Sequence, residues 1–257
     1  MIYQQEEKIS FYDIDANGDI RLTALLKYMN EAAWCNAEDL GVGMETTIQA
    51  GVTFIIQRIG IRLFKTPKLN QKIIVRTWPA AMTRIAFKRH GDIHDEDGNK
   101  MMEWESLWVL LDINERKIKR PDASPVDFPL YGEMGISIEA NKIALLETKE
   151  PLVSYNHTVK FSELDSNMHM NNAIYADLIA NVLSLGDTPN IQTWKEVYFN
   201  YVNEAKLGDH VKVDCYQVPA EAKVGASEQT HLRANELYVS GAKSEKVIFN
   251  ALIKYEE

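Results

Sequence analysis

The stretch FYDIDANGDIRL (residues 11–22) recurs later in the chain as FSELDSNMHMNN (residues 161–172). Phenylalanine, aspartate and asparagine stand at matching places in the two copies, as Phe11 and Phe161, Asp15 and Asp165, and Asn17 and Asn167. Each copy is followed by apolar residues spaced three and four apart, a pattern typical of an amphipathic helix. Strand-like segments follow each helix, so the sequence predicts one structural unit used twice.

Four strands are expected after each predicted helix, because runs of β-branched and aromatic residues alternate there with turn residues. The predicted strands are residues 53–64, 72–78, 84–94 and 100–112 in the first half, and 193–202, 211–218, 228–238 and 246–255 in the second. An antiparallel sheet hides the apolar stripe of a helix only by curling around it. We therefore predict an α+β fold with two antiparallel sheets, each wrapped round one long central helix.

A proline-rich stretch, RPDASPVDFPLYGEMG (residues 120–135), separates the two halves. Proline cannot donate a hydrogen bond to a β-ladder and interrupts helices, so this stretch is expected to be a crossing segment. We predict an N-terminal domain over residues 1–130, a linker over residues 131–155 and a C-terminal domain over residues 156–257.

Composition narrows the functional classes. The 257 residues are 46% hydrophobic and 25% charged, as in globular proteins, and the net charge of −9 disfavours nucleic acid as a partner. Neither Cys35 nor Cys215 lies in a CxxC motif, which suits a reducing, cytoplasmic setting without a disulfide framework or zinc ribbon. No secretory signal and no apolar run of about 20 residues is visible, so no membrane span is expected.

Two polar stretches imitate metal sites. Asp13–Ile20 resembles an EF-hand loop with Gly18 at the glycine position, but Ala24 stands where a bidentate glutamate would close the calcium shell. His90–Gly98 holds two histidines and four acids, yet its turn residues are explained by a solvated hairpin. We expect a polar turn and a hairpin, and no metal site, at these places.

The second copy of the repeat carries a group that the first lacks. If Asp165, Asn167 and His169 lie on extended chain, their spacing points all three side chains the same way. Asn171 or Asn172 is a favoured N-cap for the next helix, whose first N–H groups can polarise a carbonyl oxygen. A polar loop with a locally bonded histidine fits equally well. Asp19 replaces His169 in the first half, so only one half carries an acid/base group.

These residues lie in a stretch that is similar to a known family. FSELDSNMHMNNAIYADLI (residues 161–179), followed by YFNYVNEAKLGDHV (residues 198–211), resembles the acyl-ACP thioesterases, which end fatty-acid synthesis in plants and bacteria. The resemblance covers nearly the whole chain. It implies a tandem (double) hot-dog fold, hydrolysis of the thioester of fatty acyl-acyl carrier protein, and no cofactor.

The resemblance also implies a set of catalytic residues. Asp165, Asn167 and His169 match the aspartate, asparagine and histidine of the family, and Glu204 matches its downstream glutamate. Ala205 stands where plant members often have a cysteine, so a carboxylate mechanism is expected here. Glu204 would activate water or attack directly, His169 would share the proton, Asn167 would position water or the carbonyl, and Asp165 would orient its neighbours.

Further residues are expected to bind the two ends of the substrate. Asn171 and Asn172 lie beside the predicted helix start, where backbone N–H groups would stabilise the oxyanion. The acyl chain would lie between the first helix and its sheet, lined by Leu26, Met29, Trp34 and Phe54. Because acyl carrier protein is typically acidic, basic residues should dock it. The candidates are Arg84, Lys88, Arg89, Arg116, Lys117, Lys119 and Arg120.

Two other functions remain open from the sequence. One is a hot-dog thioesterase that acts on acyl-CoA, and the other is a noncatalytic acyl-binding or regulatory module. The acyl-chain length is open, and so is the choice between a monomer and a homodimer.

Overall fold

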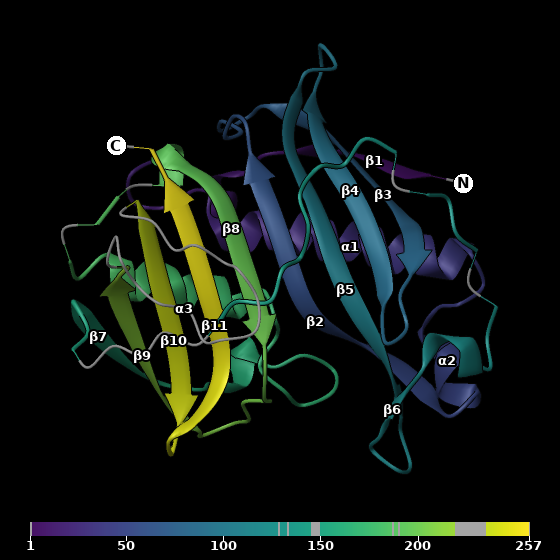
Figure 1. The fold of residues 1–257 in the computed structure, drawn as a ribbon. Helices are drawn as coiled ribbons and strands as arrows, with labels where there is room; N and C mark the ends of the chain where they lie inside the picture. Colours follow the sequence, from purple (N-terminus) through teal and green to yellow (C-terminus); the bar gives the residue numbers. More distant parts are fainter. Residues whose placement is uncertain are drawn as a thin grey trace. The chain divides into compact units, whose positions relative to one another are not determined.

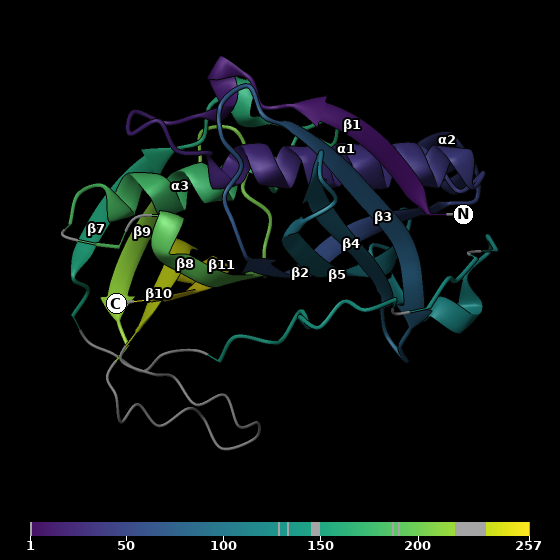
Figure 2. The ribbon, with the colours of Figure 1, turned by 90° about the horizontal axis from the view of Figure 1, so that it is seen from above.

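The computed structural model describes residues 2–127, 129–132, 134–144, 150–186, 188–189, 191–218 and 235–256. The chain divides into two compact units, which Figures 1 and 2 show in two views. Unit 1 comprises Met1–Ile20 and Ala24–Ala140, and unit 2 comprises Arg21–Thr23 and Asn141–Glu257.

Unit 1 is an antiparallel sheet with a long helix against one face. Its strands follow the order β1-β3-β4-β5-β2, and β6 pairs with β5. The strands are β1 (Tyr3–Lys8), β2 (Val52–Leu63), β3 (Lys72–Met82), β4 (Phe87–Asp95), β5 (Lys100–Asp112) and β6 (Ile118–Lys119), and the helices are α1 (Leu22–Asp39) and α2 (Met44–Gln49). Figure 1 shows α1 behind the strands of this unit.

Unit 2 repeats this plan. Its strands follow the order β7-β9-β10-β11-β8, which matches the order of unit 1 strand for strand. The elements are β7 (Val153–Thr158), α3 (Ile174–Leu183), β8 (Trp194–Tyr201), β9 (His210–Gln217), β10 (Glu236–Lys243) and β11 (Lys246–Tyr255). Short 3-10 helices at Phe11–Asp13 and Phe161–Glu163 precede α1 and α3. The prediction of an α+β fold built twice is confirmed.

The core of unit 1 forms where α1 meets the sheet. Leu25, Leu26, Met29 and Ala32 recur at helical spacing on α1, and each is at most 3% exposed. In unit 2 the equivalent face of α3 buries Leu178, Ile179 and Val182. Burying an aliphatic side chain of this kind contributes about 1.5–3 kcal/mol, so these stripes hold each helix to its sheet.

The strand predictions fail mainly at edges. The sequence pattern does not predict β1 and β7, because YQQEEK and VSYNHT alternate half-buried and exposed positions without a fully buried apolar row. The predicted strand over residues 228–238 falls partly on residues 228–234, which lie outside the described residues. The described part continues as β10 to Lys243, and the hairpin reverses at Ser244 and Glu245, both with positive φ.

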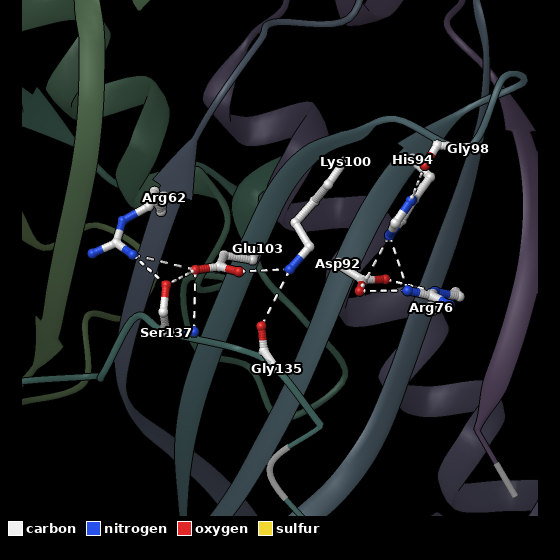
Figure 3. A network of polar contacts seen from close by, with 9 residues as sticks. All are labelled: Arg62, Arg76, Asp92, His94, Gly98, Lys100, Glu103, Gly135 and Ser137. Atoms are coloured by element: carbon white, nitrogen blue, oxygen red, sulfur yellow. Dashed lines mark hydrogen bonds and ion pairs between the residues drawn. The ribbon is translucent and has the colours of Figure 1, made fainter.

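The segment His90–Gly98 forms the predicted hairpin with its turn at Asp95–Gly98, but its strand is buried rather than solvated. His90 and Asp92 are each 2% exposed on β4, and Glu103 and Glu105 on β5 are also buried. These side chains alternate with inward-facing residues such as Ile93 and Trp104, so they lie on the face of the sheet away from α1. Figure 3 shows part of this buried polar network, in which Arg76 binds Asp92 and Lys100 binds Glu103.

Candidate active site

The candidate site lies in unit 2, in the turn between the 3-10 helix Phe161–Glu163 and α3. The Asp165 N–H donates to the His169 carbonyl (2.8 Å), and the Met168 N–H donates to the Asp165 carbonyl (3.0 Å). The Asp165 carboxylate accepts the backbone N–H groups of Asn167 (2.8 Å) and His169 (3.2 Å). The hydrogen bonds of Asp165 therefore stabilise the turn that ends at His169.

Unit 1 contains the same turn without the histidine. The Asp15 carboxylate accepts the N–H groups of Asn17 (2.8 Å) and Asp19 (3.0 Å). The Asp15 N–H donates to the Asp19 carbonyl (2.8 Å), and the Gly18 N–H donates to the Asp15 carbonyl (3.1 Å). The stretch that imitates an EF-hand loop is thus a closed polar turn whose aspartate binds its own backbone.

This geometry corrects the extended-chain interpretation. Asp165, Asn167 and His169 do not alternate along a strand, because a turn folds the backbone back between Leu164 and Met170, which form an isolated bridge. Asn167 is exposed at the tip of this turn, where its backbone N–H donates to the Asp165 carboxylate. The turn brings together only part of the predicted set.

His169 and Glu204 meet at the exit of the turn. The His169 Nε2 and Glu204 Oε2 atoms are 3.0 Å apart, and the two side chains are 22% and 37% exposed. Glu204 lies just beyond the end of β8, so the strand brings a carboxylate to the imidazole from far along the chain. An imidazole and a carboxylate at hydrogen-bond distance, open to water, can exchange a proton. At the matching places unit 1 has Asp19 and Thr66.

Two contacts hold the Glu204 segment to the turn. The Met170 N–H donates to the carbonyl of Ala205 (2.8 Å). Tyr175, in the first turn of α3, is hydrogen-bonded to the Ala205 backbone. Burial raises the pKa of Tyr175 to about 12, with the nearby Asp165 and Glu204 charges adding to the rise. The sequence does not predict Tyr175 as a site residue, because an aromatic residue at a helix start has the pattern of core packing.

The start of α3 is less open than the sequence suggests. The Asn171 Oδ1 atom accepts the N–H of Ala173 (2.9 Å), and the Asn171 carbonyl accepts the N–H of Ile174 (3.0 Å). Asn171 thus takes the capping role, although the helix formally begins after Ala173. The carbonyl of Asn172 accepts the Tyr201 hydroxyl (3.2 Å). The N–H groups of Ala173 and Ile174 are already bonded and are not free to stabilise a substrate oxyanion.

The residues predicted to line the acyl chain divide into two groups. Leu26 and Met29 are buried in the core of unit 1, and Phe54 packs edge-on against Phe87 with ring centres 5.3 Å apart. Trp34 is 50% exposed. The prediction for Trp34 as part of a buried lining is wrong, because it lies on the outward side of α1.

The residues predicted to dock a carrier are mostly engaged with acids. Arg89 is 5% exposed and donates to Asn36 Oδ1 (2.7 Å), so its prediction as a docking residue is wrong. Burial lowers the pKa of Arg89 to about 10. Lys88, Lys117, Lys119 and Arg120 each form an ion pair, with Glu105, Glu115, Asp112 and Asp122 respectively. Arg84 and Arg116 are exposed.

Metal-ligating clusters and membrane-spanning helices are both missing from the part of the chain that the structure describes. Within the described residues, no group of three or more histidine, cysteine, aspartate or glutamate side chains is placed to hold a metal ion. Among the helices of the described chain, none has the length and apolar character to cross a membrane.

Comparisons with known proteins match both units. Family profiles described as the acyl-ACP thioesterase N-terminal domain and C-terminal domain match residues 1–123 and 146–253. A palmitoyl-acyl carrier protein thioesterase of Arabidopsis thaliana is 21% identical over 198 residues, which is 72% of this chain and 48% of that protein. The chain spans about half the length of most of the plant relatives it matches.

Solved structures match over the full length. An acyl-ACP thioesterase of Bacteroides thetaiotaomicron is 24% identical, with a TM-score of 0.82 over 99% of this chain and 98% of that chain. The 12:0-ACP thioesterase of Umbellularia californica is 15% identical, with a TM-score of 0.77 over 99% and 97% of the two chains. These likenesses confirm the double hot-dog fold. With both family profiles matched in order along the sequence, the chain belongs to the acyl-ACP thioesterase family.

Proposed function

We propose that this protein hydrolyses the thioester of a fatty acyl group carried on acyl carrier protein and releases the free fatty acid. The observation that carries the proposal is the 3.0 Å approach of His169 Nε2 to Glu204 Oε2 in unit 2. The family match supports the choice of thioester and carrier. Both cysteines are free, which supports a reducing, cytoplasmic compartment.

The chemistry follows from the pair. Glu204, as general base, takes a proton from water while the water oxygen attacks the thioester carbonyl carbon. The C–S bond of the resulting tetrahedral intermediate breaks, and the sulfur leaves as a thiol after it receives the proton through His169. The carboxylate stabilises the imidazolium that forms during this transfer. Ala205 lacks a thiol, so no cysteine nucleophile is available beside Glu204.

Substrate positioning is proposed from the same geometry. Asp165 acts by fixing the turn, since its carboxylate binds the backbone of Asn167 and His169. The exposed amide of Asn167 is left to contact water or substrate. The acyl chain is proposed to lie against unit 1, near Leu26, Met29 and Phe54. Tyr175 keeps the Glu204 segment in place through Ala205.

The proposal is tested by hydrolysis of a panel of acyl-ACPs. His169→Ala and Glu204→Ala should each lower kcat by about a hundredfold or more, because each removes one partner of the proton transfer. Asp19→Ala is the matched control, since it alters the same turn position in unit 1. It should leave kcat within about twofold of wild type.

Each outcome decides between the candidate functions. Faster turnover of acyl-CoA than of the matched acyl-ACP would favour the acyl-CoA thioesterase. Acyl binding without turnover by the wild-type protein would favour the noncatalytic module. Wild-type rates in either His169→Ala or Glu204→Ala would remove that residue from the mechanism.

A further inference from the structure

Four large apolar side chains are exposed on the chain segments that carry His169 and Glu204. Phe161 is 73% exposed, Met168 56%, Val202 52% and Leu207 54%. We call these four residues the apolar rim. Single exposed apolar residues are common, but a group of them beside a catalytic pair indicates a surface that another molecule covers.

Backbone hydrogen bonds join the segments that carry the apolar rim. The Gly208 N–H donates to the carbonyl of Val159 (3.0 Å), and the Asn171 N–H donates to the carbonyl of Glu163 (2.9 Å). The Met170–Ala205 hydrogen bond connects the turn to the segment after β8. The segments that carry the four rim residues are therefore joined to one another within unit 2.

Met168 has a backbone conformation that a glycine would adopt more easily. Its φ is +61°, in the left-handed region that side chains other than Gly, Asn and Asp seldom occupy. At the matching position of the turn in unit 1 stands Gly18, with φ +80°. A large exposed apolar side chain that is kept at an unfavourable φ, next to His169, is not explained by folding of the turn.

The other rim positions have exposed apolar counterparts in unit 1. Phe11 is 74% exposed, Phe64 50% and Leu69 40%. The apolar surface is thus a property of the repeat, and Met168 is what unit 2 adds to it. Only in unit 2 do the same segments also carry an imidazole and a carboxylate, His169 and Glu204, in place of Asp19 and Thr66. Unit 1 is therefore an internal control for unit 2.

The charges near the rim favour an acidic partner. Lys160 and Lys206 are exposed on the same hydrogen-bonded segments. The acids of these segments are engaged: Glu163 pairs with His157 (2.8 Å), Asp209 with Lys243 (2.6 Å) and Glu204 with His169 (3.0 Å). The Asp165 carboxylate accepts the N–H groups of its own turn. An apolar centre with a charged border is the usual composition of a protein interface, and complementary charge speeds association.

We propose that the apolar rim is the docking surface for the carrier protein that bears the acyl thioester, with Met168 as its central contact. This inference rests on the proposed function and names the residues of this chain that would contact the carrier. A thioester that is tethered to a protein reaches the His169–Glu204 pair only when the carrier docks within reach of its tether. The docking surface is then in unit 2, rather than on the ion-paired basic residues of unit 1.

The test compares one acyl group on two thiols, acyl carrier protein and N-acetylcysteamine, the second having no protein to dock. Met168→Asn keeps a residue that tolerates positive φ and removes the apolar side chain. We expect this variant and Leu207→Asn to raise KM for acyl-ACP by about fivefold or more, as for loss of a central interface side chain. For the N-acetylcysteamine thioester, kcat/KM should stay within about twofold of wild type.

Two controls accompany these variants. Met168→Leu keeps an apolar side chain and should retain most of the wild-type KM for acyl-ACP. Leu69→Asn makes the Leu207 change at the matching place in unit 1 and should leave KM for acyl-ACP unchanged.

The remaining outcomes overturn the proposal. An equal loss of kcat/KM for the acyl-ACP and the N-acetylcysteamine thioester would show that Met168 binds the acyl chain or takes part in catalysis. A change in sedimentation of Met168→Asn relative to wild type would show that the rim joins two copies of the chain. If wild-type protein hydrolyses the N-acetylcysteamine thioester but not acyl-ACP, the proposed function itself fails, which is a result distinct from an unchanged KM in the variants.

Discussion

Asp15 and Asp165 stabilise the matching turns of the two units. Each carboxylate accepts two backbone N–H groups of its own turn. We predict that Asp15→Ala and Asp165→Ala each lower the free energy of unfolding by about 1–2 kcal/mol, because one exposed and one partly buried N–H group of each turn lose a charged acceptor. Urea unfolding measures this. Only Asp165→Ala should also lower kcat, since only its turn carries His169, and equal kcat losses in both variants would contradict the one-site interpretation.

The residues of the site are easier to predict from sequence than their geometry. Family resemblance pairs His169 with Glu204, and the structure brings them together. Their neighbours are misplaced by the spacing argument because period-two alternation applies only to extended chain, and Met168 turns the backbone into the left-handed region. The burial of Arg89 is not visible in the sequence either, since it depends on Asn36 of α1 lying opposite β4.

The segment that precedes unit 2 lies on the outer face of the unit 1 sheet, the face away from α1. Glu105 Oε1 accepts the N–H of Ala140 (3.0 Å), and the Trp78 indole donates to the carbonyl of Gly132 (2.9 Å). At Gly60, a Cβ would lie 2.5 Å from the carbonyl oxygen of Glu139. The glycine therefore lets the segment approach β2 closely. The prolines predict a linker here, but not its attachment, because the anchoring carboxylates are remote in the chain.

We predict that Gly60→Ala lowers the free energy of unfolding by about 1–3 kcal/mol, because the added methyl pushes residues 139–140 off the sheet. Urea unfolding and limited proteolysis within residues 131–144 measure the effect. Gly186→Ala is the matched control, since a Cβ there meets only side-chain atoms at 3.4 Å or more. If both variants are cut at the same rate as wild type, the attachment at Gly60 is not important.

The free energy of unfolding of the whole protein should fall at acidic pH, although protonation reduces the repulsion due to the net charge of −9. The pKa values of Asp13, Glu103, Glu105 and Asp209 all lie below their ordinary values: burial raises each pKa, but hydrogen bonds lower it more. A carboxyl with a lowered pKa stabilises the folded state above its unfolded pKa, and this stability is lost as pH falls through the folded pKa. We predict a steep loss of stability below about pH 4.5.

Urea unfolding at a series of pH values measures this loss. In Glu105→Gln the dependence on pH between about 5 and 3 should be shallower than in wild type, because one titrating group is gone. Glu115→Gln, at an exposed ion pair, is the control and should leave the slope unchanged. An identical slope in Glu105→Gln would exclude that carboxyl as a source of acid sensitivity.

The two turns around Asp15 and Asp165 have one further consequence, for the history of the fold. Their backbone closes by the same hydrogen bonds whether the last residue is Asp19 or His169, so the shape of the turn does not depend on that side chain. After a gene duplication, a single codon change at that place adds or removes the imidazole without the need to rebuild the loop. The same turn can therefore present an imidazole in one unit and a carboxylate in the other.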